Sequence, residues 1–232
     1  MNIFEFLRDW SEVWPLLIPL IIFLIWRPTG KSIGALVWYV FLAFVVNFWA
    51  IFILEYYNLL PEWTYRKGNN LFYNLHSFIM VIFFGWYLVT VRSYKYKIFL
   101  KALLGFYVIL VIANFAFFEP FHRLSTRHFT VGSIILLLLC LFYFFSSIME
   151  ESKNNWVNHP SFIIVSAIFL YQAVTFFIFL FIYPLYDKSY NIDLSFAYLM
   201  MRVYQVIFIV FCIMLGIGLI KYHKQKRGSI AL

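Results

Sequence analysis

Seven apolar stretches, separated by short polar segments, follow one another along the chain. The hydrocarbon core of a bilayer is about 30 Å thick, and a helix needs roughly 20 apolar residues to cross it. The stretches that qualify or nearly qualify are 13–26, 33–57, 71–91, 98–118, 130–149, 162–183 and 196–222. The pattern predicts an all-α, polytopic membrane protein in which residues 1–232 form a single transmembrane domain, a seven-helix bundle.

The first stretch is the shortest and contains two prolines. Proline is tolerated in the first turn of a helix, which suits Pro15, but Pro19 is expected to kink the helix. The linkers are about a dozen residues or shorter, so we expect no extramembrane domain. The N-terminal residues lack a basic region and a small-residue cleavage site, so we expect no cleavable signal.

Composition supports lipid as the solvent. Hydrophobic residues make up 64% of the chain, the mean hydropathy is +0.86, and charged residues make up 12%, about half the usual share in soluble domains. The net charge of +8 does not indicate nucleic acid, because the basic residues lie between apolar stretches and near the C-terminus. Cys140 and Cys212 both fall within apolar stretches and are expected to be small buried hydrophobes.

Lysine and arginine counts predict the orientation. The side that holds the N-terminus carries six basic residues and the other side carries eleven, while Arg202 lies within the last stretch. Cytoplasmic loops are enriched in Lys and Arg. We therefore expect a multi-pass protein of the inner (plasma) membrane, with the N-terminus outside and the C-terminus in the cytoplasm.

Polar residues inside the apolar stretches are the candidates for function, because ionisable groups in a membrane are costly. Most of them fall in the outer half of the predicted bundle and would form an outer polar cup: Glu55, His76, Asn114, Glu119, Arg202 and Gln205. Asn47 and Gln172 lie near the midplane. Helical spacing places Tyr73 and His76 on one face, and Arg202 and Gln205 on another.

Two interpretations of these residues stay open. In the first, Arg202 pairs with Glu55 or Glu119, and His76 bonds to either carboxylate in a ligand-responsive cavity. In the second, Arg202 and Glu55 form an interhelical clamp, and the amides are hydrogen-bonding groups between helices, worth about 0.6 kcal/mol each.

The segment "NNLFYNLHSFIM", residues 69–80, carries Asn74 and His76 near the predicted outer end of its helix. Asn70 and Asn74 are one turn apart near the interface, so Asn74 is expected to be hydrated. Residues two positions apart on a helix point about 200° away from each other. Asn74 and His76 are therefore not expected to share a site.

Most catalytic and cofactor patterns are absent from the sequence. No two histidines are three or four residues apart, no serine nucleophile elbow occurs, and the last stretch has no lysine before Lys221. We expect no cofactor and no metal, with an outer zinc site of His76, His122 and Glu119 as the alternative. Gly216 and Gly218 are interpreted as packing positions.

Two segments carry a resemblance to a known group. Residues 69–80 resemble a pattern N-L-W-L-Y-H-I-Y-T-L-I-E-F, in which Tyr73 matches, while Asn74, His76 and Met80 replace His, Tyr and Glu. "HPSFIIVSAIFLYQ", residues 159–172, is similar to N-P-L-F-W-I-N-S-G-I-L-I-Y-F, with matches at Pro160, Phe162, Ser166, Ile168 and Tyr171. Both patterns occur in small seven-helix bacterial membrane proteins of unassigned function. The resemblance implies a membrane-embedded bundle and no established activity.

The sequence favours a sensory or signalling module that responds to an outer-side or lipid-borne cue. Without an output domain, it would act through a partner membrane or cytoplasmic protein, with the lipid bilayer around it and no nucleic acid. A structural or assembly subunit of a larger membrane complex is the alternative. A third hypothesis is an intramembrane enzyme acting on lipid, with His76 and Glu55 as an acid/base pair.

Overall fold

The computed structural model describes residues 3–28, 30–56, 69–91, 97–150, 159–186 and 194–230, and this part of the chain is helical without a β-strand. The elements are α1 (Ile3–Asp9), η1 (Trp14–Leu16), α2 (Leu17–Trp26), α3 (Lys31–Glu55), α5 (Asn70–Thr90), α6 (Lys97–Ala113), the π-helical turn η3 (Asn114–Phe118), α7 (Thr126–Glu150), α8 (Pro160–Tyr186) and α9 (Leu194–Ile230).

Six helices in the described part are long and apolar enough to cross a membrane: Ser32–Glu55, Asn70–Thr90, Lys97–Phe118, Thr126–Met149, Pro160–Leu180 and Tyr198–Gln225. The chain is therefore a multi-pass membrane protein by architecture. The first predicted span corresponds to the shorter apolar helix Trp14–Trp26. At 1.5 Å per residue it is about 20 Å long, which is less than the thickness of a hydrocarbon core.

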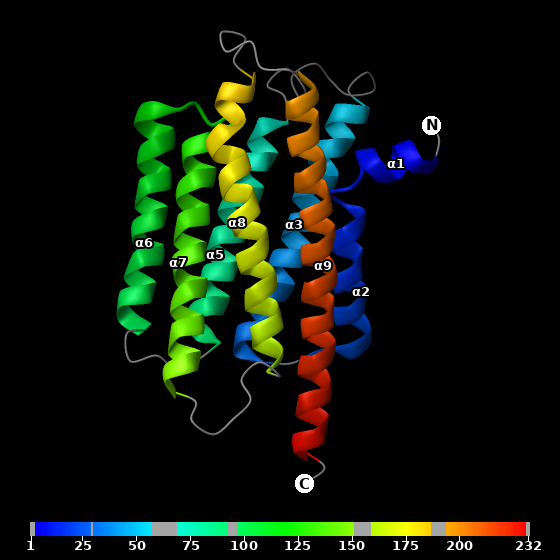
Figure 1. The fold of residues 1–232 in the computed structure, drawn as a ribbon, viewed down its shortest axis with the longest axis vertical. Helices are drawn as coiled ribbons and strands as arrows, with labels where there is room; N and C mark the ends of the chain where they lie inside the picture. The colour runs from blue at the N-terminus through cyan, green and yellow to red at the C-terminus, as the bar shows by residue number, and fades with distance from the viewer. Residues whose placement is uncertain are drawn as a thin grey trace.

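The long helices form a ring. Contacts run from α2 to α3, α3 to α5, α5 to α7, α7 to α8, α8 to α9 and α9 back to α2. Helix α6 lies outside this ring and packs against α5 and α7, as Figure 1 shows at the left edge of the bundle. Helix α1 projects to the side of the bundle, near the end at which α5, α7 and α9 begin (Figure 1).

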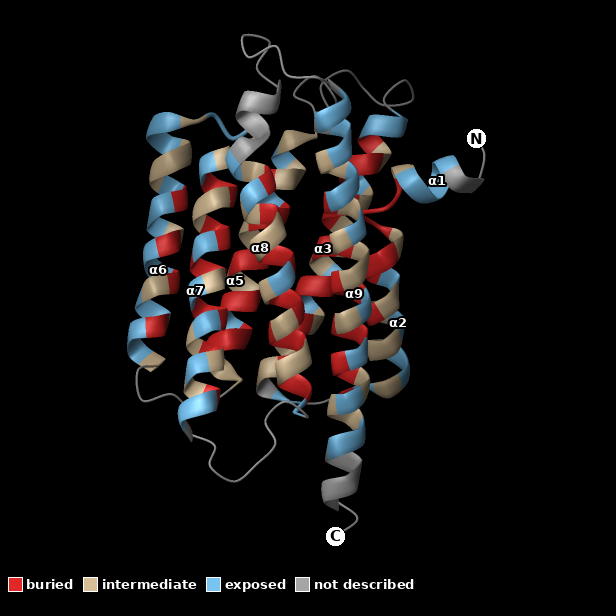
Figure 2. Cartoon of the chain, viewed as in Figure 1, coloured by how far each residue is buried: buried red, intermediate tan, exposed pale blue. Residues whose placement is uncertain are grey.

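Aromatic side chains fill the centre of the ring. Tyr39, Phe84, Tyr171, Phe208 and Phe211 are each at most 2% exposed. The outward faces are apolar as well, and Figure 2 shows buried residues facing inward and exposed ones facing outward along each long helix. A protein that exposes this much apolar surface needs lipid around it, so the fold and the composition agree.

Small residues allow the helices to approach closely. A Cβ atom added at Gly218 of α9 would lie 2.4 Å from Ile164 of α8, and one at Gly216 would lie 2.7 Å from Ile22 of α2. Membrane helices associate through such small residues, because they have no hydrophobic driving force between them. The interpretation of Gly216 and Gly218 as packing positions is confirmed. Cys140 and Cys212 are buried, as expected.

The N-terminal region differs from expectation. Helix α1 was not predicted, because seven residues with mixed polarity carry no clear period. Pro19 lies in the first turn of α2, after the 3-10 turn η1 that contains Pro15. The first backbone N–H groups of a helix have no partner within it, so Pro19 removes no helical hydrogen bond there. At this position Pro19 therefore gives no reason to expect a kink in α2.

Candidate functional site

A cavity of about 100 Å³ is lined by residues of α5, α7, α8 and α9 and of the segment that follows α1. Its lining residues, one of which precedes α7, are Glu12, Tyr73, His76, Leu124, Phe129, Ile178, Phe179, Met201 and Tyr204. Four of these residues are polar, and one of the four, Glu12, carries a carboxyl group. We call this space the Glu12 cavity.

The turn between α1 and η1 delivers Glu12 to the cavity. Helix α3 holds this turn, because the side-chain amide of Asn47 donates a hydrogen bond to the backbone oxygen of Glu12 (3.1 Å). Trp10 and Val13 pack with Ile51 of α3 in a small hydrophobic cluster. The backbone around Glu12 is therefore anchored on both sides, and its side chain is only 8% exposed.

The surroundings of Glu12 raise the pKa of its carboxyl group into the neutral range. Burial raises its pKa from 4.5 to about 7, although a hydrogen bond with Tyr73 acts in the opposite direction. The raised value means that neither the neutral nor the ionised form dominates strongly at neutral pH. A group with such a pKa inside a cavity is a candidate functional residue.

His76 lies beside Glu12 in the cavity wall and also connects two helices. It is 4% exposed, and its Nε2 atom is 3.4 Å from the hydroxyl of Tyr39 on α3. The two rings are stacked with centroids 6.1 Å apart. Elsewhere in the ring of helices, Tyr171 of α8 donates a hydrogen bond to the hydroxyl of Tyr204 on α9 (3.2 Å). The polar groups of the cavity therefore connect α3 with α5 and α8 with α9.

Some buried oxygens in this region have no hydrogen-bond partner within the described residues. They include the Oγ atoms of Ser11 and Ser77, and the Oδ1 atom of Asn47. The Oε1 atom of Gln172 is in the same condition, while its Nε2 atom bonds to the sulfur of Met80 (3.2 Å). Unpaired buried acceptors are costly, but none of these four residues lines the Glu12 cavity. Asn47 and Gln172 are both buried.

The structure distributes the six residues of the predicted cup over four places. His76 lines the Glu12 cavity. Asn114 and Glu119 belong to a separate network at the end of α6. Arg202 and Gln205 lie in a surface groove with Arg8 and Asp9, and Glu55 is exposed at the end of α3. The predicted shared faces, Tyr73 with His76 and Arg202 with Gln205, are both found.

The expected ion pairs of Arg202 are not found in the described part of the chain. Glu119 forms an ion pair with Arg127 (3.5 Å) and also accepts hydrogen bonds from Asn114 and Ser125. Neither Arg202 nor Glu55 forms an ion pair with any residue that the structure describes. The proposed acid/base pair of His76 and Glu55 is also not assembled, because His76 is buried and Glu55 is exposed.

Asn74 corrects an expectation. It is fully buried rather than hydrated, and its amide donates hydrogen bonds to the backbone oxygens of Phe121 (2.9 Å) and Arg123 (2.7 Å). Its Oδ1 atom accepts a hydrogen bond from the backbone N–H of Ser125 (3.1 Å). Asn74 therefore fixes the segment between η3 and α7, while His76 faces the cavity. The expectation that the two residues do not share a site agrees with this arrangement.

Sequence reasoning missed the central residue, Glu12. It precedes the first apolar stretch, so a search restricted to those stretches could not find it. The available signal was an isolated carboxyl within "WSEVWP", where apolar residues flank it on both sides. Tyr204 was not singled out because tyrosines are abundant in this chain, with 17 in total.

No group of three or more His, Cys, Asp or Glu side chains that could hold a metal ion occurs among the residues that the structure describes. Protein-family models, curated proteins and solved structures were compared with the chain, and none of them matches it.

Proposed function

We propose that this chain is a membrane sensory module that responds to a cue in the Glu12 cavity and acts through a partner protein. The observation that carries the proposal is a buried carboxyl, with a pKa near 7, in a cavity at the junction of several helices. In this proposal the α1 end of the bundle faces outward and the C-terminal end of α9 is cytoplasmic, which follows the distribution of basic residues.

The size and polarity of the cavity limit the cue. A cavity of about 150 Å³ holds one benzene ring, so a space of about 100 Å³ admits a proton, water or a molecule of a few heavy atoms. Glu12, Tyr73, His76 and Tyr204 are the titratable groups that face it. The cue is therefore protonation of Glu12 or a small polar molecule that donates a hydrogen bond to its carboxylate.

The route to an output runs through the helices that carry the cavity's hydroxyl groups. An ionised Glu12 carboxylate forms stronger hydrogen bonds with donor groups than a neutral one does. The hydroxyl of Tyr73 on α5 already bonds to it. Tyr204 lies on α9, which continues to Ile230 at the opposite end of the bundle. A cue moves such an equilibrium only by interacting differently with two helix arrangements, and the charge of Glu12 provides that difference.

Distance measurements between spin labels test the proposal. Labels at the exposed positions Phe145 of α7 and Ile217 of α9 would be introduced after Cys140 and Cys212 are replaced by alanine. In lipid nanodiscs, we expect the distance distribution to change between pH 5 and pH 8. Glu12→Gln should remove this change, and Glu55→Gln, which alters an exposed carboxyl, should retain it. A distribution that is identical at both pH values would contradict the proposal.

The subunit alternative rests on α6. The span that α6 forms with η3 is the least buried of the six long ones, and Ile98, Phe99 and Ile109 on α6 are more than 60% exposed. Such a face suits a partner helix as well as lipid. Purification in a mild detergent separates the two functions: a fixed partner at constant stoichiometry favours the subunit, and a monodisperse single protein favours the sensory module.

A further inference from the structure

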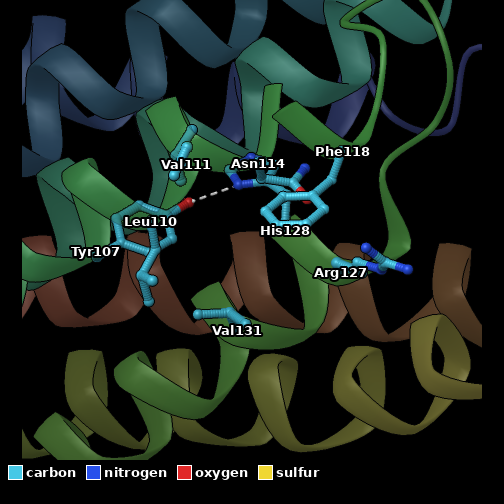
Figure 3. A pocket seen from close by; sticks show the side chains of 9 residues that line it. Tyr107, Leu110, Val111, Asn114, Phe118, Arg127, His128 and Val131 are labelled. Atoms are coloured by element: carbon cyan, nitrogen blue, oxygen red, sulfur yellow. Dashed lines mark hydrogen bonds between the residues drawn. The ribbon is translucent and has the colours of Figure 1, made fainter. Parts of the chain in front are cut away.

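A second, larger cavity of about 240 Å³ lies between α6 and α7. Its walls come from Tyr107, Leu110, Val111 and Ala113 of α6, from Asn114 and Phe118 of η3, and from Arg127, His128 and Val131 of α7. Figure 3 shows these side chains around the space, with Arg127 at one end and Tyr107 toward the other. We call it the α6/α7 groove.

The groove opens toward the lipid rather than toward the ring. Leu110 and Phe118 in its lining are 36% and 68% exposed, and Ile109 and Phe117 beside them are 63% and 81% exposed. Helix α6 lies outside the ring, so these side chains face the surroundings of the protein. In a membrane, the molecules that can enter a groove of this kind from the side are lipids.

The wall of the groove presents few unmet polar groups. The hydroxyl of Tyr107 bonds to Nδ1 of His128 (3.1 Å), and Nε2 of His128 bonds to the backbone oxygen of Asn74 (3.2 Å). Because these groups already have partners, a hydrocarbon chain can lie against them without leaving them unsatisfied. A volume of about 150 Å³ holds the six carbons of benzene, so this groove admits about ten carbons of an acyl chain.

Arg127, a cationic side chain of the groove wall, lies where the headgroup of such a lipid would lie. Phe118 ends one candidate span and Arg127 comes directly after Thr126, which begins the next, so both lie at the membrane surface. The side chain of Arg127 is 66% exposed, and its Nε atom pairs with Glu119 (3.5 Å). Its guanidinium carbon lies 6.0 Å from the ring centre of Phe118. The two terminal nitrogens of the guanidinium are therefore available for a phosphate.

The π-helical turn η3 shapes the upper part of the groove. The backbone N–H of Glu119 bonds to the oxygen of Asn114, five residues earlier (2.9 Å), which widens the helix at that point. Single π-helical turns are frequent at functional sites. Here the turn places Asn114 and Phe118 on the same wall, between the apolar part of the groove and Arg127.

We propose that the α6/α7 groove binds an anionic phospholipid, with one acyl chain between the helices and the phosphate on Arg127. The proposal is independent of the Glu12 cavity, because the two spaces share no lining residue. It assigns Arg127 a role in selecting the headgroup and Ala113 a position beneath the acyl chain.

Native mass spectrometry of the full chain with defined lipids tests the proposal. Phosphatidylglycerol and phosphatidylcholine with the same acyl chains would be titrated separately. We expect tighter binding of one phosphatidylglycerol, and Arg127→Gln should reduce that preference about fivefold, the factor that corresponds to about 1 kcal/mol per basic residue at a membrane surface. Arg8→Gln is the matched control, because Arg8 is also exposed, at 58%, and paired with an acidic residue.

A second variant tests the acyl-chain position. Ala113→Trp should fill the groove and remove the tightly bound lipid for both headgroups, and an unchanged elution volume would show that the variant is folded. Equal affinity of the wild-type chain for the two lipids would overturn the proposal. An Arg8→Gln variant that loses the preference as strongly as Arg127→Gln would also overturn it, and so would an Ala113→Trp variant that retains both lipids.

Discussion

The side chain of Asn74 accepts a hydrogen bond from the backbone N–H of Ser125, across 51 positions of sequence (3.1 Å). The hydroxyl of Ser125 in turn accepts a hydrogen bond from the backbone N–H of His128 in the first turn of α7 (3.2 Å). One amide on α5 therefore determines where α7 begins. This contact connects the ring to the segment that carries Glu119 and Arg127.

Replacement of Asn74 by leucine should destabilise the protein by about 2–4 kcal/mol. The substitution removes hydrogen bonds with Phe121, Arg123 and Ser125, and it leaves the buried backbone N–H of Ser125 without a partner. Thermal unfolding in detergent measures the effect. Asn70→Leu is the control one turn earlier, and a loss of the same size in both variants would contradict a specific role for Asn74.

Glu12 predicts a dependence of stability on pH. Its pKa is raised from 4.5 to about 7 in the folded state, so its favourable contribution is fully present below pH 4.5 and is lost as the pH rises through about 7. At 1.36 kcal/mol per pKa unit, the difference between the two limits is about 3 kcal/mol.

Unfolding temperatures measured from pH 4 to pH 8 test this dependence. Glu12→Gln should flatten the profile, because a glutamine does not titrate. His76 is another titratable group that lines the same cavity, so His76→Gln separates its contribution. A slope that persists in Glu12→Gln and disappears in His76→Gln would assign the titration to the imidazole instead.

Gly85 and Gly105 should respond in opposite directions to alanine. A Cβ atom at Gly85 would lie 2.3 Å from Leu104 on α6, whereas one at Gly105 would meet no atom within 4 Å. We expect Gly85→Ala to cost about 1–3 kcal/mol through overpacking, and Gly105→Ala to be neutral or to stabilise by up to about 1 kcal/mol. The free energies of unfolding can be compared in one detergent.

A double mutant tests the reason for that difference. If the clash with Leu104 is the cause, Gly85→Ala should cost less in a Leu104→Ala background than in the wild-type chain. An equal cost in both backgrounds would show that another neighbour of Gly85 is responsible.

Glu119 and Glu55, the two predicted partners of Arg202, should contribute differently to the stability of the protein. Glu119 holds Asn114, Ser125 and Arg127, so Glu119→Ala should cost about 1–3 kcal/mol. Glu55→Ala, at an exposed position without an ion pair among the described residues, should change stability by less than about 0.5 kcal/mol. Thermal unfolding of both variants provides the measurement, and a large effect of Glu55→Ala would indicate a contact with Arg202.

The fold was predictable from sequence because the signal for a membrane helix is long and local. Six apolar stretches of the expected length are helices in the structure, and the positions of their ends differ by a few residues. The short helix Trp14–Trp26 was also located, although its length sets it apart. Helix α1 and the π-helical turn η3 were not foreseen, because their formation depends on packing and capping rather than on hydrophobic period.

The candidate site was only partly predictable, because depth in the membrane does not determine which way a side chain points. His76 and Tyr73 were correctly placed on one face, since helical spacing alone decides that relation. The predicted cup combined residues of similar depth, yet Glu55 and Arg202 turned out to be exposed. Glu12 enters the bundle from a turn outside the long helices, which no helical period can reveal.

The position of Glu12 has a consequence for biogenesis. Glu12 is synthesised before Tyr73 and Tyr204, which line the cavity with it and follow about 60 and 190 residues later. During insertion, the carboxyl group must remain in contact with water or headgroups until α9 joins the bundle, because an unpartnered charge in hydrocarbon is costly. Closure of the Glu12 cavity therefore has to wait for the insertion of α9, which carries Tyr204.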